Sequence, residues 1–141
     1  MKEKEIKIAE WFLRIALSAG FLSASADRFG LWPKNVSAWG NWQSFVTYTQ
    51  SLNPYAPYSL IPLLAYTATG LEIALGILLL TNFKTIWIAR ASSALLLLFA
   101  LSMTIAISIK TPLDYSVFTG SAAAFMLSII VQLRQNKNNP N

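Results

Sequence analysis

The sequence predicts an all-α integral membrane protein: a four-transmembrane-helix antiparallel bundle with an amphipathic outer-side helix between spans one and two. Two observations support this prediction. Hydrophobic residues make up 55% of the 141 residues and charged residues only 12%, which is too apolar for a soluble domain of this size. In addition, stretches near the ~20 apolar residues needed to cross a bilayer occur four times, at about 8–26, 58–80, 85–109 and 113–133.

The first apolar stretch, 8–26, has some features of a secretory signal peptide. The charged segment KEKEIK precedes it, and ASA stands before Asp27. However, Glu10 and Arg14 lie inside the stretch, and it is longer than the apolar core of most signal peptides. We therefore predict an uncleaved membrane span.

The outer segment, 27–57, is rich in aromatic residues and contains the longest connection between spans. Three- and four-residue spacing predicts a short amphipathic helix with Asn35 or Ser37 as its N-cap and its end at Asn53-Pro54; its spaced residues are Trp39, Trp42, Val46, Thr49 and Leu52. Because Trp and Tyr favour the headgroup level, this helix is expected on the outer face. Either an anchor in the interface or a lid over a ligand cavity fits this pattern.

The later spans are joined by the short segments TNFK and KTP, so neighbouring helices should pack antiparallel. Small residues such as those in GSAAA allow close helix contacts. The tail, 134–141, is polar and is expected to be disordered. We treat residues 1–141 as a single membrane domain.

The net charge of +5 reflects basic residues at the chain ends and in short loops. They form no continuous stripe, so nucleic acid is not expected as a partner. Most would lie on the side of the termini (Lys2, Lys4, Lys7, Lys84, Arg134 and Lys137), and three on the other side (Arg28, Lys34 and Lys110). The positive-inside rule therefore predicts a multi-pass protein of a bacterial-type cytoplasmic (inner) membrane with both termini cytoplasmic.

The sequence contains neither cysteine nor histidine. Disulfides, thiolate nucleophiles and most zinc, haem and iron–sulfur sites are therefore excluded. No glycine-rich dinucleotide fingerprint or P-loop occurs either. We expect no metal and no nucleotide cofactor.

Glu72 is the most unusual residue, because it interrupts the apolar run ATGLEIALGILLL. Counted from the inner end of its span, it lies about 12 Å deep, and Arg14 and Arg90 are predicted at the same level. We expect Glu72 to be bridged by these two arginines, with hydroxyl groups of Tyr66, Thr67 and Thr69 nearby. Glu72 and Arg14 are the candidate catalytic residues, and the candidate ligand-binding residues beside them are Arg90, Glu10 and Tyr66.

A second charged layer is predicted on the outer side. It contains further candidate ligand-binding residues, namely Asp27, Arg28, Lys110 and Asp114, and its cations could attract an anion. Each unpaired charge in the bilayer would cost about 2.5–3.5 kcal/mol, so pairing is expected in both layers. Such pairs either only determine which helices face one another or mark a site for a polar ligand or a proton.

The chain resembles the DoxX-like family of small four-span membrane proteins. The segments that carry the resemblance are LSAGFLSASADRFG after an arginine, GNWQSFVTY, LNPYAP, LEIALGILLL, PLDYSVF and SAAAF. The resemblance implies a four-helix bundle related to the DoxD subunit of thiosulfate:quinone oxidoreductase, with relatives in membrane redox complexes and methylamine utilisation. Arg14, Glu72 and Asp114 match the polar pattern of that family.

Two functions remain open from the sequence. The first is the membrane subunit of a quinone-linked oxidoreductase, with a quinone or similar lipophilic ligand at an intramembrane Arg/Glu cluster and electrons from a redox partner subunit or a bound reductant. The second is a non-enzymatic membrane scaffold or assembly factor whose buried charges are structural. Both place the chain in a lipid bilayer and leave room for a homo-oligomer. A transporter is less compatible, because one small bundle offers little room for alternating access.

Overall fold

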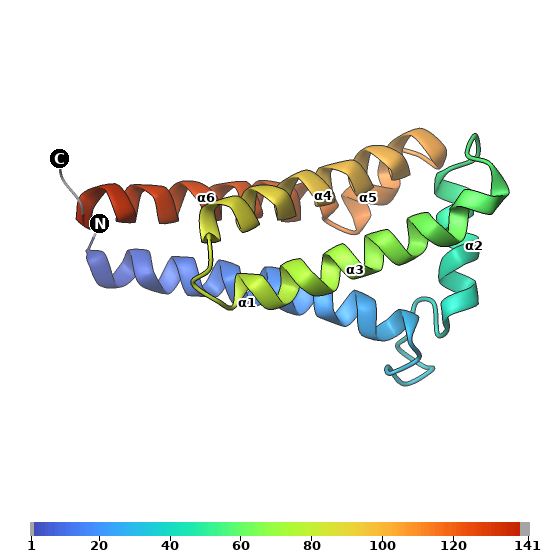
Figure 1. Ribbon diagram of the computed structural model, residues 1–141, viewed down its shortest axis with the longest axis horizontal. Coiled ribbons are helices and arrows are strands. Elements are labelled where there is room, and N and C mark those ends of the chain that lie inside the picture. The colour runs from blue at the N-terminus through green and yellow to red at the C-terminus, as the bar shows by residue number, and fades with distance from the viewer. Residues whose placement is uncertain (1, 139–141) are drawn as a thin grey trace.

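The computed structural model describes residues 2–138, and this part of the chain is helical without any β-strand. Its elements in chain order are α1 (Glu3–Arg28), α2 (Trp42–Leu52), the short 3-10 turn η1 (Tyr58–Leu60), α3 (Ile61–Leu79), α4 (Thr85–Ala106), α5 (Lys110–Asp114) and α6 (Val117–Asn138). Figure 1 shows the four long helices running lengthwise, with α2 across one end.

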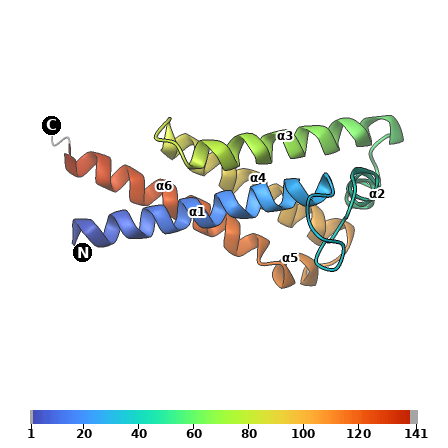
Figure 2. The ribbon, with the colours of Figure 1, turned by 90° about the horizontal axis from the view of Figure 1, so that it is seen from below.

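The long helices form two antiparallel pairs. α4 packs along α6 and α1 packs along α3, while α1 also contacts α6. The start of α1 and the end of α6 lie at the same end of the bundle, which we call the terminal end (Figures 1 and 2). α2 and α5 lie at the opposite end, which we call the distal end.

The apolar core lies between the four long helices. It contains buried residues from each of them: Leu17, Phe21, Leu75, Leu79, Ala89, Leu95, Ala124, Leu127 and Val131. Many large apolar side chains point outward instead, among them Phe12 (72% exposed), Ile105 (78%) and Leu133 (64%). Such a surface is compatible with hydrocarbon around the bundle.

Within residues 2–138, three helical stretches are long and apolar enough to cross a membrane: Tyr58–Leu79, Thr85–Ala106 and Val117–Asn138. They make the chain an all-α, multi-pass membrane protein. α1 has 26 residues but is not among these three. It differs from them in its four buried charged residues, Glu10, Arg14, Asp27 and Arg28.

The helix predicted in the outer segment exists as α2, but it begins later than the sequence suggested. Asn41 is its N-cap, because Oδ1 of Asn41 accepts a hydrogen bond of 2.9 Å from the backbone N–H of Ser44. The prediction of Asn35 or Ser37 as the N-cap was therefore wrong. α2 ends at Leu52, directly before the predicted stop at Asn53.

α1 and α3 are staggered along the bundle axis. The hydroxyl group of Ser18 donates a 2.6 Å hydrogen bond to the carbonyl oxygen of Gly76, which sets their register. Gly76 permits this close crossing, since a Cβ there would lie 3.1 Å from Cγ of Leu22. α1 consequently extends past the end of α3 at the terminal end, and α3 extends past α1 at the distal end (Figure 1).

The last helix also differs from its predicted bounds. The predicted span at 113–133 is divided, since α5 ends at Asp114, Ser116 adopts a positive φ of 56°, and α6 begins at Val117. α6 then continues to Asn138. The predicted disorder of the tail is therefore wrong for residues 134–138, and residues 139–141 lie outside the described part.

Candidate functional site: two buried charge clusters

Most of the buried charged side chains among the described residues belong to two separate clusters. The terminal cluster consists of Glu10, Arg14 and Arg134. The distal cluster consists of Arg28, Glu72 and Thr69. Both clusters join α1 to another long helix, but their surroundings differ.

Arg14 is the centre of the terminal cluster and is only 1% exposed. Its Nη2 donates a 2.6 Å hydrogen bond to Glu10 Oε1 and a 3.1 Å bond to Oγ1 of Thr85. Its Nη1 donates to the carbonyl oxygens of Thr81, at 2.6 Å, and Leu79, at 3.3 Å. A cation at the C-terminal end of α3 also interacts favourably with the helix dipole. Through these hydrogen bonds, Arg14 holds α1 against the turn between α3 and α4.

Glu10 connects the terminal cluster to α6. Its Oε2 lies 2.8 Å from Nε of Arg134, and its Oε1 accepts a 3.2 Å hydrogen bond from Nη2 of the same arginine. One carboxylate thus lies between two guanidinium groups, which leaves the cluster with a single excess positive charge.

Arg28, the last residue of α1, is the centre of the distal cluster. It forms an ion pair with Glu72 of α3, and its Nη1 donates a 2.7 Å hydrogen bond to Oγ1 of Thr69. Arg28 and Glu72 are only 3% and 4% exposed. The pair is electrically neutral and links two helices, and the hydrogen bond to Thr69 helps to offset its desolvation.

Aromatic side chains cover Arg28. Its guanidinium carbon lies 3.8 Å from the ring centroid of Phe45 and 5.2 Å from that of Trp39, in cation–π geometry. Phe45 packs edge-on against Trp39 at 5.3 Å, and Trp42 stacks on Tyr66 at 4.5 Å. We call these four residues the aromatic roof; it occupies the space that α1 leaves by ending short of α3.

Two hydrogen-bond donors in the distal cluster region are unused. Ser25 lies one helical turn before Arg28, and both Oγ of Ser25 and Nε of Arg28 are buried without a hydrogen-bond partner among the described residues. Nε of Arg14 and Nε of Arg134 are the comparable atoms of the terminal cluster, but Nε of Arg134 lies 2.8 Å from Oε2 of Glu10. A buried unpaired polar group costs about 1–3 kcal/mol, so the two distal donors require an explanation.

The predicted partners of Glu72 were wrong. Glu72 pairs with Arg28, whereas Arg14 pairs with Glu10. Arg90 donates a 3.1 Å hydrogen bond to Oε1 of Gln132 instead. The reason is the stagger of α1 against α3, which places Arg14 at the end of α3 and not at the level of Glu72.

Of the three hydroxyl groups expected near Glu72, only that of Thr69 belongs to the distal cluster. Thr69 accepts its hydrogen bond from Arg28, next to Glu72. Tyr66 is 62% exposed and stacks on Trp42, and Thr67 is also exposed. The pairing of a buried carboxylate with a guanidinium group from another helix is nevertheless confirmed.

The predicted outer layer divides into three separate interactions. The carboxylate of Asp27 accepts hydrogen bonds from the hydroxyl group of Ser37 and from the backbone N–H groups of Ala38, at 2.8 Å, and Trp39, at 3.1 Å. Asp27 thereby holds the loop before α2. Arg28 belongs to the distal cluster, while Lys110 and Asp114 form an exposed ion pair within α5.

Sequence reasoning missed Arg134 and Ser25 as members of these sites. Arg134 was assigned to a polar tail, although both chain ends were expected on one side of the membrane, where Glu10 also lies. Ser25 occurs in the segment SASADR, which suggests only close helix packing.

Comparison with known proteins corrects the family assignment. The family model described as methylamine utilisation protein MauE matches residues 6–116, from the first turn of α1 to the residue before α6. No curated protein and no solved structure matches the chain. The resemblance to the DoxX-like family was wrong, since the matching model is that of a different membrane family. The chain belongs to the MauE family of methylamine utilisation proteins.

Proposed function

We propose that this protein is a membrane-embedded accessory subunit in methylamine utilisation, with α1 as a fourth membrane span. α1 packs along α3 and also contacts α6, and two of its charged residues are paired with those helices. Burial of these charges inside the bundle lets a helix of low hydropathy share the membrane with its apolar neighbours.

The excess of basic residues at the terminal end favours cytoplasmic termini in a bacterial-type inner membrane. The distal end then faces outward, and α2 is an amphipathic helix at the outer interface. In support, α2 buries Phe45 and Thr49 towards the bundle and exposes Gln43, Thr47 and Gln50.

The distal cluster is the best candidate for a ligand site, and its ligand is of the quinone class. The observation that carries this proposal is the pair of unused buried donors, Oγ of Ser25 and Nε of Arg28. A quinone carries carbonyl oxygens, which need such donors, and a tail that dissolves among lipid chains. The terminal cluster is less suited, because Nη1 of Arg14 donates to helix-end carbonyls and Nη2 to Glu10 and Thr85, which leaves only Nε of this arginine unused.

Ser25, Arg28 and Glu72 each have a defined part in this proposal. Ser25 and Arg28 donate to a quinone carbonyl, and Glu72 exchanges protons with its oxygen. Reduction of a quinone to a quinol takes up two electrons and two protons, and the electrons come from a redox partner subunit. The aromatic roof excludes water, which strengthens the electrostatic interactions beneath it.

Quinone binding by the purified protein tests this function. We expect quinone in lipid extracts of protein prepared in mild detergent, and a rise in Tm when a soluble quinone analogue is added. Ser25→Ala and Glu72→Gln should each abolish the rise. Ser18→Ala is the matched control, because it removes a hydroxyl group from the same helix that bonds only to Gly76; it should keep the rise. Absence of quinone and of any Tm change in the unmodified protein would refute quinone binding.

A scaffold or assembly factor is the second candidate function. The observation that favours it is that the buried carboxylates of Glu10, Asp27 and Glu72 all have partners within the chain, as expected if they only organise the bundle. Under this function, Glu72→Gln lowers the stability of the bundle or the recovery of partner proteins with it, while the protein binds no quinone at any concentration.

A further inference from the structure

The entire net charge of the protein lies at its terminal end. Eight cations and three acids belong to the segments nearer that end, namely the start of the chain with the first half of α1, the turn between α3 and α4 with the first turns of α4, and the end of α6: Lys2, Lys4, Lys7, Arg14, Lys84, Arg90, Arg134 and Lys137 with Glu3, Glu5 and Glu10. The other three cations, Arg28, Lys34 and Lys110, are balanced by Asp27, Glu72 and Asp114. The terminal end therefore carries the whole formal charge of +5 and attracts anions, while the distal end is neutral.

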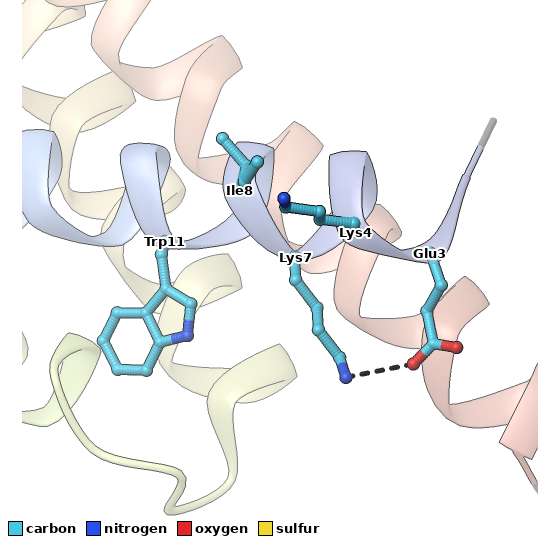
Figure 3. Close-up of a pocket in the computed structure, with 5 residues that line it drawn as sticks. All are labelled: Glu3, Lys4, Lys7, Ile8 and Trp11. Atoms are coloured by element: carbon cyan, nitrogen blue, oxygen red, sulfur yellow. Dashed lines mark ion pairs between the residues drawn. The ribbon is translucent and has the colours of Figure 1, made fainter.

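An open hollow of about 470 Å³ lies along the first turns of α1, and its lining is both cationic and apolar: Glu3, Lys4, Lys7, Ile8 and Trp11. The last four residues recur at three- and four-residue spacing and so follow one side of the helix. In Figure 3, Lys7 and Trp11 leave α1 on the same side, with Lys7 paired to Glu3. The guanidinium carbon of Arg14 lies 5.0 Å from the ring centroid of Trp11 and so helps to orient the indole.

The position of this hollow along the bundle axis matches a membrane interface. Arg14 contacts the turn between α3 and α4, so the residues before it extend beyond the end of α3 (Figure 1). At 1.5 Å per residue, Lys7 lies about 10 Å beyond Arg14, with Trp11 between them. An indole favours the boundary between acyl chains and headgroups, and lysines attract the anionic headgroups beyond it.

We propose that this hollow binds the headgroup of an anionic phospholipid. The phosphate lies between Lys4 and Lys7, and the upper part of an acyl chain lies along Ile8 and Trp11. We favour a lipid over a free anion because the apolar side chains of Ile8 and Trp11 lie directly beside the two lysines. A free phosphate would leave these apolar side chains uncovered.

Glu3 modulates the proposed site. It forms a 3.0 Å ion pair with Lys7, and both side chains are about half exposed. The hydrogen bond and the charge of Lys7 lower the pKa of Glu3, so its carboxylate remains ionised and competes with the phosphate. Exposed pairs of this kind are weak, so the phosphate can displace Glu3.

Lipid titration of the full-length protein in mild detergent tests the proposal, with Tm and native mass spectrometry as readouts. Phosphatidylglycerol should raise Tm and remain bound, whereas phosphatidylcholine and inorganic phosphate should do neither. Lys4→Gln/Lys7→Gln should weaken phosphatidylglycerol binding about 30-fold, from the attraction typical of two lysines at an anionic membrane surface. Glu3→Gln should strengthen it. These side chains are exposed, so the variants should fold normally.

Lys34→Gln/Lys110→Gln is the matched control, since it removes the same charge from the distal end. It should bind phosphatidylglycerol as the unmodified protein does. Equal weakening by the two double variants would overturn the proposal, because binding would then follow net charge alone. An equal response to phosphatidylcholine or to inorganic phosphate would overturn it as well.

Discussion

Arg14 and Arg28 are both buried on α1, yet their surroundings differ. Arg14 lies where α3 ends, and its guanidinium group is held by carbonyl oxygens, a hydroxyl group and Glu10. Arg28 lies beside the middle part of α3, where Glu72 and Thr69 hold one edge and the ring of Phe45 covers its face. The first arginine donates to carbonyl groups at the end of a helix, whereas the second belongs to a neutral pair below the short helix α2.

This difference separates a structural charge from a candidate functional one. Removal of Arg14 leaves unpaired carbonyl groups and a buried carboxylate, so no apolar residue can replace it. The distal pair has no backbone acceptor, and an apolar pair can replace it in the fold but not at a ligand site. Stability measurements on matched variants can therefore test the comparison directly.

The largest expected effect is that of Arg14→Met. The variant leaves Leu79 and Thr81 without a hydrogen-bond donor and removes one of the two partners of Glu10. We expect a loss of about 3–5 kcal/mol in the free energy of unfolding, measured by denaturant titration in detergent. Arg90→Met is the control at the same end, where the guanidinium group bonds only to Gln132, and should cost less than about 1 kcal/mol. Equal losses would contradict the special role of Arg14.

The second largest effects are expected when the members of each buried ion pair are replaced by apolar residues, first singly and then together. Glu72→Leu alone leaves Arg28 without its counter-ion and should cost about 3 kcal/mol. Arg28→Met/Glu72→Leu should restore most of that loss, since a buried ion pair is often no more stable than an apolar pair. Glu10→Leu/Arg14→Met should stay destabilised, because the helix-end carbonyls remain unpaired. Similar recovery in both double variants, measured by Tm, would remove the distinction between the clusters.

Asp27→Asn should have a moderate effect confined to the loop before α2. The amide can replace only part of the carboxylate contacts to Ser37, Ala38 and Trp39, so we expect a loss of about 1–2 kcal/mol. Limited proteolysis of segment 30–41 should become faster. Asp114→Asn, in the exposed pair of α5, is the control and should leave the cleavage rate unchanged; an unchanged rate in Asp27→Asn would show that Asp27 does not hold the loop.

Ser25→Ala is the one variant for which we expect no loss of stability. The hydroxyl group of Ser25 has no partner among the described residues, so its removal relieves a buried unpaired group and should raise the free energy of unfolding of the unliganded protein by about 1 kcal/mol. Ser18→Ala removes the hydrogen bond to Gly76 and should cost about 1 kcal/mol. A large loss of stability in Ser25→Ala would reveal an internal partner for this hydroxyl group and weaken the argument for a ligand.

The helices were predictable from the sequence, but the partners of the charges were not. Apolar runs locate α3, α4 and α6 because a helix needs about 20 such residues to cross a bilayer. Depth counted from the ends of each run assumed that the runs start and stop at common levels. α1 instead begins at Glu3 and extends past the end of α3. Arg14 therefore donates a hydrogen bond to the carbonyl oxygen of Leu79 and does not reach Glu72. Helix stagger depends on tertiary contacts such as Ser18 with Gly76, which no local pattern encodes.

The cover of the distal cluster was partly predictable. Aromatic spacing indicated a helix in the outer segment, and the stop at Asn53-Pro54 was correct. The cation–π contact of Arg28 with Phe45 was not predicted, because Phe45 does not belong to the set of regularly spaced residues that contains Trp39 and Trp42. Phe45 is the residue of α2 that turns inward over the guanidinium group.

The attachment of Arg14 to the end of α3 bears on biosynthesis. Its backbone acceptors, Leu79 and Thr81, follow it by 65 and 67 residues in the chain. When α1 has just left the ribosome, Glu10 of the same helix is available to this guanidinium group, but its acceptors at the end of α3 are not yet made. On the proposed topology, we therefore expect α1 to remain at the translocation channel or the membrane surface until α3 has been synthesised. The two helices would then insert into the bilayer together.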